Sequence, residues 1–323
     1  MTEADLESHR RDVTAELRAD VREGLTADQK WLPPKWFYDA EGSKLFEKIT
    51  ALPEYYPTRS EREVLAARAA EIAERTGAHT LVELGSGSSE KTRLLLDALT
   101  AHGTLEAFVP MDVSETALAE AAAAITADYP KLEVRGVVGD FTQHLQLLPG
   151  TAPRVVAFLG GTIGNFLPDE RAEFLHSVRD VLGEGEWLLL GTDLVKDRET
   201  LERAYDDSAG VTAAFNRNVL RVINAELGAD FDPDEFDHVA HWNADREWIE
   251  MRLRARRRTE VRIPGADLIV PFAEGEHIRT EVSAKFRPDG VEAELNAAGF
   301  ALERWWTDSQ QRFGVSLARS VRA

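Results

Sequence analysis

The sequence predicts an α/β protein whose main domain is a doubly wound, mostly parallel β-sheet. Apolar runs alternate with helical patterns, and a glycine-rich turn joins the first run to the helix that follows it. The runs at 81–84, 105–112, 154–159 and 186–190 are nearly continuous in apolar residues. Such runs are typical of strands that are buried on both faces of a parallel sheet, with helices as the connections.

The segment before the first strand is predicted to hold three helices. Residues 3–23 have a charged helical pattern, 43–50 form a short amphipathic helix, and an alanine-rich helix over 61–77 leads towards the glycine turn. Two prolines within 32–39 predict a non-helical loop that carries three aromatic residues. The pair Tyr55–Tyr56 lies between prolines, so its rings and hydroxyls are rigidly presented for core packing or for binding.

Beyond the turn, helices and strands continue to alternate up to residue 190. Helices are expected from residue 91, over 115–127 and over 168–182. A strand is expected over 132–138, between the second and the third of these helices. Each helix can therefore serve as a crossover between parallel strands.

The alternation breaks after residue 195 and resumes near the C-terminus. Residues 198–227 predict one long helix with Gly210 inside it, and strand-like segments follow. A helix at 288–298 and a closing hairpin then return the chain to the first sheet. We therefore expect a ligand-binding α/β domain formed by 61–195 and 286–323, and a second, α+β, substrate-binding domain formed by 1–60 and 196–285.

The glycine-rich turn, residues 85–92, is predicted to bind a nucleotide-like ligand. Gly85 and Gly87 permit positive φ angles and a close approach to the main chain, and the next helix offers unpaired N–H groups. A P-loop and a dinucleotide fingerprint both need glycine at the position of Glu90, whose carboxylate would repel phosphate. S-adenosylmethionine has no phosphate and is cationic. Glu83, at the end of the strand, resembles the acidic residue in the first motif of class I methyltransferases.

Polar side chains follow the next three strands of the predicted sheet. Asp112 ends the second strand, where a carboxylate can accept both hydroxyls of a ribose. Asp140 follows the third strand, where it can accept an exocyclic amino group while Phe141 packs beside the base. Asn165 lies in the loop after the fourth strand, the usual place to meet an acceptor substrate. Ligands bind beyond the carboxyl ends of such strands, so we expect these residues to surround one site.

Composition excludes several classes of function. A net charge of −19 and an isoelectric point near 4.9 disfavour nucleic acid and anionic membranes as partners. The lack of cysteine excludes disulfides and thiolate chemistry. The histidines are scattered, and the one close pair, His238 and His241, would face opposite sides of a strand, so no metal site is expected. No apolar run approaches the ~18 residues of a membrane span and no signal sequence is evident, which favours a cytoplasmic protein.

The second domain contains an alternating strand, residues 278–286, with a candidate polar pair. A period of two places Glu281 and Ser283 on the same side, roughly 7 Å apart, where they could hold one small polar ring. A solvent-facing pair fits this pattern equally well. Met251, on the apolar face of a neighbouring strand, is a candidate for the same pocket. The arginines within 252–258 are interpreted as a solvated strand face.

Several short motifs are spread over both predicted domains. They are LPPKWFYD (32–39), LPEYYPTR (52–59), LVELGSG (81–87), GTIGN (161–165), LGTDLVK (190–196), AYDD (204–207), AAFNRN (213–218) and EVS (281–283). Over nearly the whole chain this set resembles the histidine N-alpha-methyltransferases of ergothioneine biosynthesis. The glycine loop identifies only a superfamily, whereas the combined set is highly specific. One local difference is Ala284, where a cysteine is often found.

The resemblance implies a Rossmann-like class I methyltransferase that transfers three methyl groups from S-adenosylmethionine to the α-amine of L-histidine, which gives hercynine. By this resemblance, the residues that hold the cofactor would be Gly85, Lys91, Asp112, Asp140 and Phe141. Asn165 and Tyr205 would hold the backbone end of histidine, and Tyr55, Glu281 and Ser283 would surround its imidazole. Tyr38 would lie near the amine, and we interpret it as the catalytic residue that passes the proton to solvent.

Three alternatives remain open on the sequence. The chain could methylate another amino acid or small amine, it could be a nucleotide-binding regulatory module without catalysis, or it could be a nicotinamide dehydrogenase. Incubation of the amino acids with labelled cofactor would show methylation of another substrate, and cofactor binding without turnover would indicate a regulatory module. A change in hydride-linked absorbance on addition of the dinucleotide would identify a dehydrogenase. A monomer is expected, because no long unpaired apolar stripe is evident.

Overall fold

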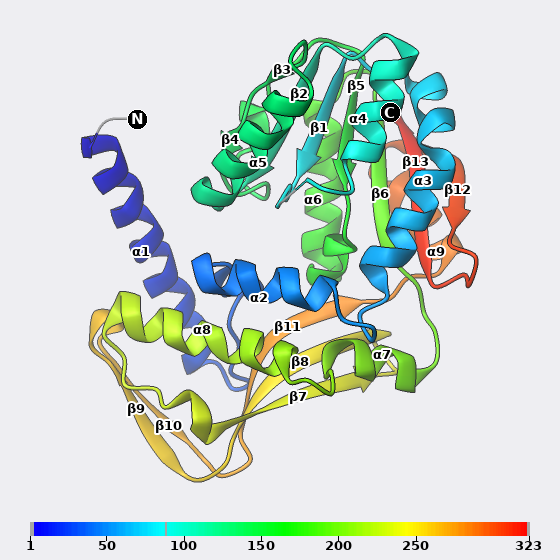
Figure 1. Ribbon diagram of the computed structural model, residues 1–323. Helices are drawn as coiled ribbons and strands as arrows, with labels where there is room; N and C mark the ends of the chain where they lie inside the picture. Colours follow the sequence, from blue (N-terminus) through cyan, green and yellow to red (C-terminus); the bar gives the residue numbers. More distant parts are fainter. Residues whose placement is uncertain (1–2, 88, 322–323) are drawn as a thin grey trace. The chain divides into compact units, whose positions relative to one another are not determined.

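The computed structural model describes residues 3–87 and 89–321, and the chain divides into two compact units (Figure 1). Unit 1 consists of the residues up to Tyr55 together with Asp197–Ser283, and unit 2 of Tyr56–Lys196 together with the residues from Ala284 onward. The chain therefore passes between the units three times, at 55/56, 196/197 and 283/284. The boundaries expected from the sequence are 60/61, 195/196 and 285/286, which differ from these positions by five, one and two residues. That one unit binds the cofactor and the other the substrate stays a prediction.

Unit 2 is built on one sheet with the order β12-β13-β6-β5-β1-β2-β3, and β4 also pairs with β2. β13 runs antiparallel to both of its neighbours, and the other pairs are parallel. The strands are β1 (Thr80–Leu84), β2 (Ala107–Asp112), β3 (Glu133–Val134), β4 (Val137–Val138), β5 (Arg154–Phe158), β6 (Trp187–Asp193), β12 (Phe300–Thr307) and β13 (Phe313–Ser320). This topology confirms the predicted doubly wound α/β class. The strand order reverses between β1 and β5, where such sheets bind ligands.

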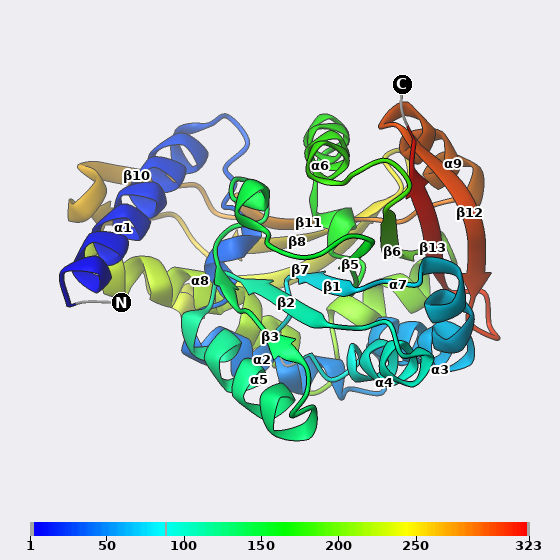
Figure 2. The ribbon, with the colours of Figure 1, turned by 90° about the horizontal axis from the view of Figure 1, so that it is seen from above.

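Helices cover both faces of this sheet (Figure 2). On one face lie α3 (Pro57–Thr76), α4 (Arg93–His102) and α5 (Glu115–Asp128), and on the other lie α6 (Pro168–Val181) and α9 (Pro288–Ala297). Two short 3-10 helices, η2 (Leu145–Leu147) and η3 (Thr162–Asn165), follow β4 and β5. Because the sheet is covered on both sides, all five residues of β1 are buried, and the continuous apolar runs of the sequence are explained.

Unit 1 combines a three-stranded sheet, β11-β8-β7, with a two-stranded β9-β10 ribbon and four helices. α8 packs against α2, β7 and β8, and α1 also contacts α8. The helices are α1 (Glu3–Thr26), α2 (Ala40–Thr50), α7 (Arg198–Tyr205) and α8 (Val211–Leu227), with the 3-10 turns η1 (Pro34–Phe37), η4 (Pro233–Glu235) and η5 (Pro264–Ala266). The strands are β7 (Phe236–Asn243), β8 (Trp248–Ala255), β9 (Thr259–Ile263), β10 (Leu268–Phe272) and β11 (His277–Ala284).

Three local expectations were wrong. The long helix over 198–227 is two helices, because Gly210 has a left-handed φ of 73° and Asp207 accepts the N–H groups of Val211 and Thr212. The segment 32–39 contains the turn η1, since a proline is tolerated in the first turn of a helix. The strand expected over 132–138 is two pieces of two residues each, β3 and β4.

Arginines of β8, and those that follow it, pair with carboxylates of unit 1. The Arg252 guanidinium binds Glu250 at 2.7 Å, and Arg254 and Arg256 bind Asp237 at 3.3 and 2.7 Å. Glu250, expected on the exposed face of its strand, is only 6% exposed. Arg254 and Arg256 are exposed, as on the solvated strand face that the sequence indicated, whereas Glu250 is buried beside a half-buried Arg252.

Candidate functional site

The glycine turn after β1 is fixed to the end of β2 by its backbone. Gly85 and Gly87 have φ angles of 68° and 48°, in the left-handed region that favours glycine. The N–H groups of Gly85 and Ser86 both donate to the carbonyl of Met111, at 2.8 and 3.1 Å. A Cβ atom at Gly85 would lie 3.5 Å from the ring of Phe141. The turn thus lies at the switch point of the sheet with an aromatic ring beside it.

Asp112 closes this turn from the carboxyl end of β2. Its Oδ2 accepts the N–H of Gly87 at 3.0 Å, and its Oδ1 accepts the N–H of Ser114 at 2.9 Å. A carboxylate has about four lone-pair directions, so two remain for other donors such as ribose hydroxyls. The structure therefore brings together Gly85, Gly87 and Asp112, as the sequence predicted for unit 2.

Asp140 and Phe141 follow β4 and lie beside an aromatic cluster. Asp140 accepts the backbone N–H and the hydroxyl of Thr142 through Oδ1, at 2.8 and 2.7 Å. The ring of Phe141 packs edge-on against Phe158 and Phe174, with centroids 5.1 and 6.0 Å apart. An apolar wall next to Gly85 with a carboxylate at its edge suits a flat base that carries an amino group.

Asn165 ends the 3-10 turn η3, which connects β5 to α6. The turn begins after Gly161, whose φ is 71°, and Phe166 behind it packs on Phe174 at 5.0 Å. Asn165 is therefore held at the carboxyl end of β5, the strand next to β1. This is the edge of the sheet on which the sequence analysis placed it.

Lys91 has a partner that sequence reasoning missed. Its ammonium forms an ion pair with Glu61 of α3, and the other oxygen of Glu61 accepts the N–H of Gly160 at 2.7 Å. Glu61 has an exposed fraction of 0%. It thus links the loop after β5 to the loop after β1. No signal in the sequence marks Glu61, because it is one acidic residue among several in an alanine-rich helix.

Glu83 is buried beneath the turn and is held by two hydroxyls. Ser89 Oγ donates to Glu83 Oε2 at 2.9 Å, and Thr92 Oγ1 donates to Oε1. Burial raises the pKa of Glu83 from 4.5 to about 7, against the opposing effect of these two hydrogen bonds. The carboxyl group is therefore partly protonated near neutral pH.

We expect a pH-dependent stability term from Glu83. The folded-state pKa lies above the ordinary value, so the contribution of the protonated form is fully present below pH 4.5 and is lost as the pH rises through 7. Between pH 5 and pH 8, the contribution of Glu83 to the free energy of unfolding should fall by about 2 to 3 kcal/mol. In Glu83→Gln, whose amide oxygen can accept one hydroxyl while its NH2 group donates to the other, the free energy of unfolding measured by urea denaturation should depend less on pH by this amount. Parallel curves for the variant and the unaltered protein would contradict this.

In unit 1 the structure brings together three of the predicted substrate residues. The hydroxyls of Tyr205 and Ser283 are 2.8 Å apart, and the ring of Tyr55 packs edge-on against that of Tyr205 at 6.3 Å. Glu281 lies on β11 with Ser283 and is half-buried, and Met251 in β8 is buried. A tyrosine pair and a serine hydroxyl thus meet at the end of β11.

Tyr38 belongs to an aromatic group that includes Tyr55. Its ring packs edge-on against Phe46 at 5.6 Å and against Phe215 at 5.5 Å, and Phe46 packs against Tyr55 at 6.3 Å. The stretch 32–39, whose prolines prevent a long helix, is fixed at its end because Asp39 accepts the N–H of Gly42 at 2.7 Å. The orientation of Tyr38 is therefore determined by the packing of α2 and α8.

A buried network behind Tyr205 was not foreseen. His238 Nε2 lies 2.7 Å from the carbonyl of Tyr205, and its Nδ1 lies 2.8 Å from the amide nitrogen of Asn216. Asn216 Oδ1 in turn accepts the hydroxyl of Thr280 at 2.6 Å. The carbonyl requires the ring proton on Nε2, and burial lowers the pKa of His238, so the imidazole is neutral. Its hydrogen bond to the carbonyl of Tyr205 fixes the end of α7.

The described residues contain neither a metal-binding cluster nor a membrane-spanning helix. Within 3–87 and 89–321, no group of three or more histidine, aspartate or glutamate side chains is arranged to hold a metal ion. Over the same described ranges, every helix is too short or too polar to cross a bilayer.

Comparisons with known proteins give a consistent result. A family described as "Histidine-specific methyltransferase, SAM-dependent" matches residues 17–320. The histidine N-alpha-methyltransferase of Mycolicibacterium smegmatis is 60% identical over 302 residues, and that of Mycobacterium tuberculosis is 58% identical over 302 residues; each match covers 94% of both chains. The ergothioneine biosynthesis protein 1 of Schizosaccharomyces pombe is 32% identical over 243 residues, which cover 71% of this chain and 31% of that protein. The family match spans both units.

Proposed function

Because the chain belongs to the family of histidine-specific, S-adenosylmethionine-dependent methyltransferases, we propose that it is a histidine N-alpha-methyltransferase. It transfers methyl groups from S-adenosylmethionine to the α-nitrogen of L-histidine, and three transfers give hercynine, the first step of ergothioneine biosynthesis. The observation that carries this conclusion is the high identity to two enzymes of that name over nearly the whole chain.

The turn after β1 fits the cofactor, which supplies an electrophilic methyl group on a sulfonium when it is bound. Ser86 Oγ is buried and has no hydrogen-bond partner among the described residues, and such groups call for a ligand or water. It lies between the two left-handed glycines, where the polar amino-acid part of the cofactor would reach it. The residues that would hold the remainder are Gly85, Lys91, Asp112, Asp140 and Phe141.

The substrate residues have complementary tasks in this proposal. Asn165 and Tyr205 hold the backbone end of histidine, and Tyr55, Met251, Glu281 and Ser283 surround the imidazole. Glu281 offers an acceptor and Ser283 a donor or an acceptor, which together match the N–H and the lone pair of the ring. Methyl transfer then requires a neutral amine in line with the reacting bond, and positioning supplies much of the acceleration.

Each transfer needs a neutral amine, so the ammonium form must first lose a proton. We assign the removal of this proton to Tyr38. The hydroxyl would pass the proton to solvent, while Phe46 and Phe215 hold the ring. Tyr38→Phe should therefore lower kcat by about 100-fold with little change in the KM for histidine. Tyr129→Phe, which removes a hydroxyl bound to Asp97 at 2.6 Å on another part of the chain, is the matched control. Unchanged turnover in Tyr38→Phe would dismiss the assignment.

A comparison of amino-acid substrates tests the proposed function as a whole. The protein is incubated with methyl-labelled S-adenosylmethionine and each standard amino acid in turn, and label in the amino-acid fraction is measured. Histidine should be the preferred acceptor by at least 100-fold in kcat/KM. Preference for another amine would overturn the proposal, and cofactor binding without transfer would favour a regulatory module. That the enzyme is monomeric and cytoplasmic stays a prediction.

A further inference from the structure

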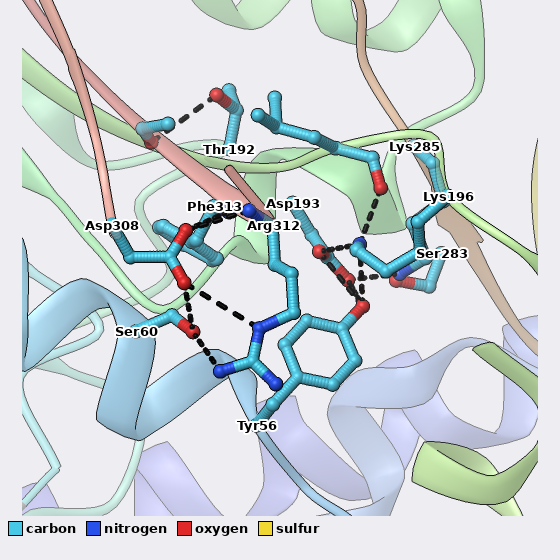
Figure 3. Close-up of polar contacts among 12 residues, drawn as sticks. Tyr56, Ser60, Thr192, Asp193, Lys196, Ser283, Lys285, Asp308, Arg312 and Phe313 are labelled. Atoms are coloured by element: carbon cyan, nitrogen blue, oxygen red, sulfur yellow. Dashed lines mark hydrogen bonds and ion pairs between the residues drawn. The ribbon is translucent and has the colours of Figure 1, made fainter. Parts of the chain in front are cut away.

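A buried charged cluster, whose members have no role assigned so far, lies at the carboxyl end of β6. Asp193, the last residue of β6, accepts the Tyr56 hydroxyl at 2.9 and 2.7 Å through its two oxygens (Figure 3). The ammonium of Lys196 lies 2.6 Å from Oδ1, and that of Lys285 lies 3.0 Å from Oδ2. Lys196 also donates to the Tyr56 hydroxyl at 2.6 Å. We call these four residues the Asp193 cluster.

Burial of the Asp193 cluster costs free energy, because it removes charged groups from water. Asp193 is 3% exposed and Lys285 is 4% exposed. Burial alone would raise the pKa of Asp193, but the ammonium groups of Lys285 and Lys196 hold it below its ordinary value. Burial lowers the pKa of Lys196 to about 8. Buried ion pairs are often no more stabilising than apolar residues of similar volume, so stability alone does not account for this arrangement.

The members of the cluster lie where the chain passes between its two units. Tyr56 and Lys196 are the unit 2 residues at the 55/56 and 196/197 crossings, and Lys285 comes directly after Ala284 at the third. Backbone hydrogen bonds join the last two segments: Phe286 N–H donates to the carbonyl of Asp193 at 2.8 Å, and Val195 N–H donates to that of Phe286 at 3.0 Å. One carboxylate therefore fixes all three connecting segments on the unit 2 side.

The residues just across two of these crossings are assigned to substrate binding by the proposed function. Tyr55 is bonded directly to Tyr56, and Ser283 is two residues from Lys285. Successive Cα atoms are only 3.8 Å apart, so a displacement of Tyr56 or Lys285 is passed on to these neighbours. We propose that Asp193 is a positioning residue for histidine binding, which fixes Tyr55 and Ser283 through the connecting segments at 55/56 and 283/284. This inference rests on the proposed function, which assigns Asp193 no direct contact with histidine.

The test compares Asp193→Asn with Glu186→Gln. Glu186 is also buried, at 4% exposure, and it accepts the backbone N–H of Arg154 at 2.8 Å and a guanidinium N–H of the same residue at 2.7 Å. It directly precedes β6, at the opposite end of that strand from Asp193. Asp193→Asn should raise the KM for histidine at least 10-fold while the affinity for S-adenosylhomocysteine, measured by calorimetry, stays within twofold. Glu186→Gln should leave both within twofold, although each variant lowers the melting temperature.

Two further measurements keep the proposal open to refutation. The double variant Asp193→Asn/Lys196→Met restores the charge balance and serves if the single variant does not fold; it should show the same rise in KM. Amide hydrogen exchange should be faster in peptides covering 53–58, 194–199 and 281–287 of the Asp193 variants, and unchanged there in Glu186→Gln. An unaltered KM and unaltered exchange in an Asp193 variant, with the unaltered protein active on histidine, would overturn the inference. If the unaltered protein does not methylate histidine, the proposed function fails, and equal exchange in those peptides would separately refute the role of Asp193 as an anchor.

Discussion

Glu281→Ala is expected to lower kcat/KM for histidine by about 10- to 100-fold and to bring larger aromatic amino acids closer to it as substrates. In the proposed complex the carboxylate accepts the imidazole N–H, and a buried donor left without a partner costs roughly 1–3 kcal/mol. Each 1.4 kcal/mol is about a tenfold change in rate. Removal of the carboxylate also makes room for a bulkier ring. The lost hydrogen bond and the added space should therefore both lower the preference for histidine over larger aromatic amino acids.

The matched control for this prediction is Glu260→Ala, which removes an exposed carboxylate from β9 in the same unit. Initial rates with histidine, phenylalanine and tryptophan are compared for the two variants and the unaltered protein. Glu260→Ala should keep the original ratios. An unaltered histidine preference in Glu281→Ala would show that Glu281 does not bind the imidazole.

Asp112→Ala is expected to weaken cofactor binding by about 100-fold or more. The substitution leaves the N–H groups of Gly87 and Ser114 without their acceptor, so the turn after β1 loses its attachment to β2. It also removes the carboxylate that would accept ribose hydroxyls, and hydrogen bonds to charged groups contribute about 1.5–3 kcal/mol. The combined loss exceeds about 3 kcal/mol, which corresponds to two orders of magnitude in affinity.

Calorimetric titration with S-adenosylhomocysteine measures this effect without turnover. The control is Glu115→Ala, an exposed carboxylate in the first turn of α5, which should bind normally. Glu281→Ala should also bind the cofactor normally, since its defect concerns histidine. If Asp112→Ala bound S-adenosylhomocysteine as tightly as the unaltered protein, Asp112 would not belong to the cofactor site. Another group would then have to accept the ribose hydroxyls.

The fold of unit 2 was largely predictable because its strands are buried on both faces. The apolar runs that became β1, β5 and β6 are continuous, and the glycine turn fixed the connection after β1. The sequence did not reveal that the expected strand over 132–138 splits into β3 and β4, each of only two residues, because Arg135 and Gly136 fit an extended pattern as well as a bend. Likewise Gly210 is compatible with a helix interior, and only the bonds to Asp207 show that a new helix begins there.

The candidate site was predictable where residues lie at strand ends and unpredictable where distant segments meet. Asp112 could be placed from the topology alone, since it ends β2, the strand that pairs with β1. Glu61 and Asp193 could not, because their partners lie on segments far apart in the sequence. For Asp193 one weak signal existed: an acidic residue ends an apolar strand, and Lys285 stands between the apolar residues Ala284 and Phe286.

The position of the methyl groups on the product tests the central claim most directly. The protein is incubated with histidine and S-adenosylmethionine that carries a ¹³C-labelled methyl group, and the product is examined by mass spectrometry and NMR. We predict a mass gain of three methyl groups, all equivalent and all attached to the α-nitrogen, with the imidazole unmodified. A methyl group on a ring nitrogen, or no labelled histidine at all, would contradict the account.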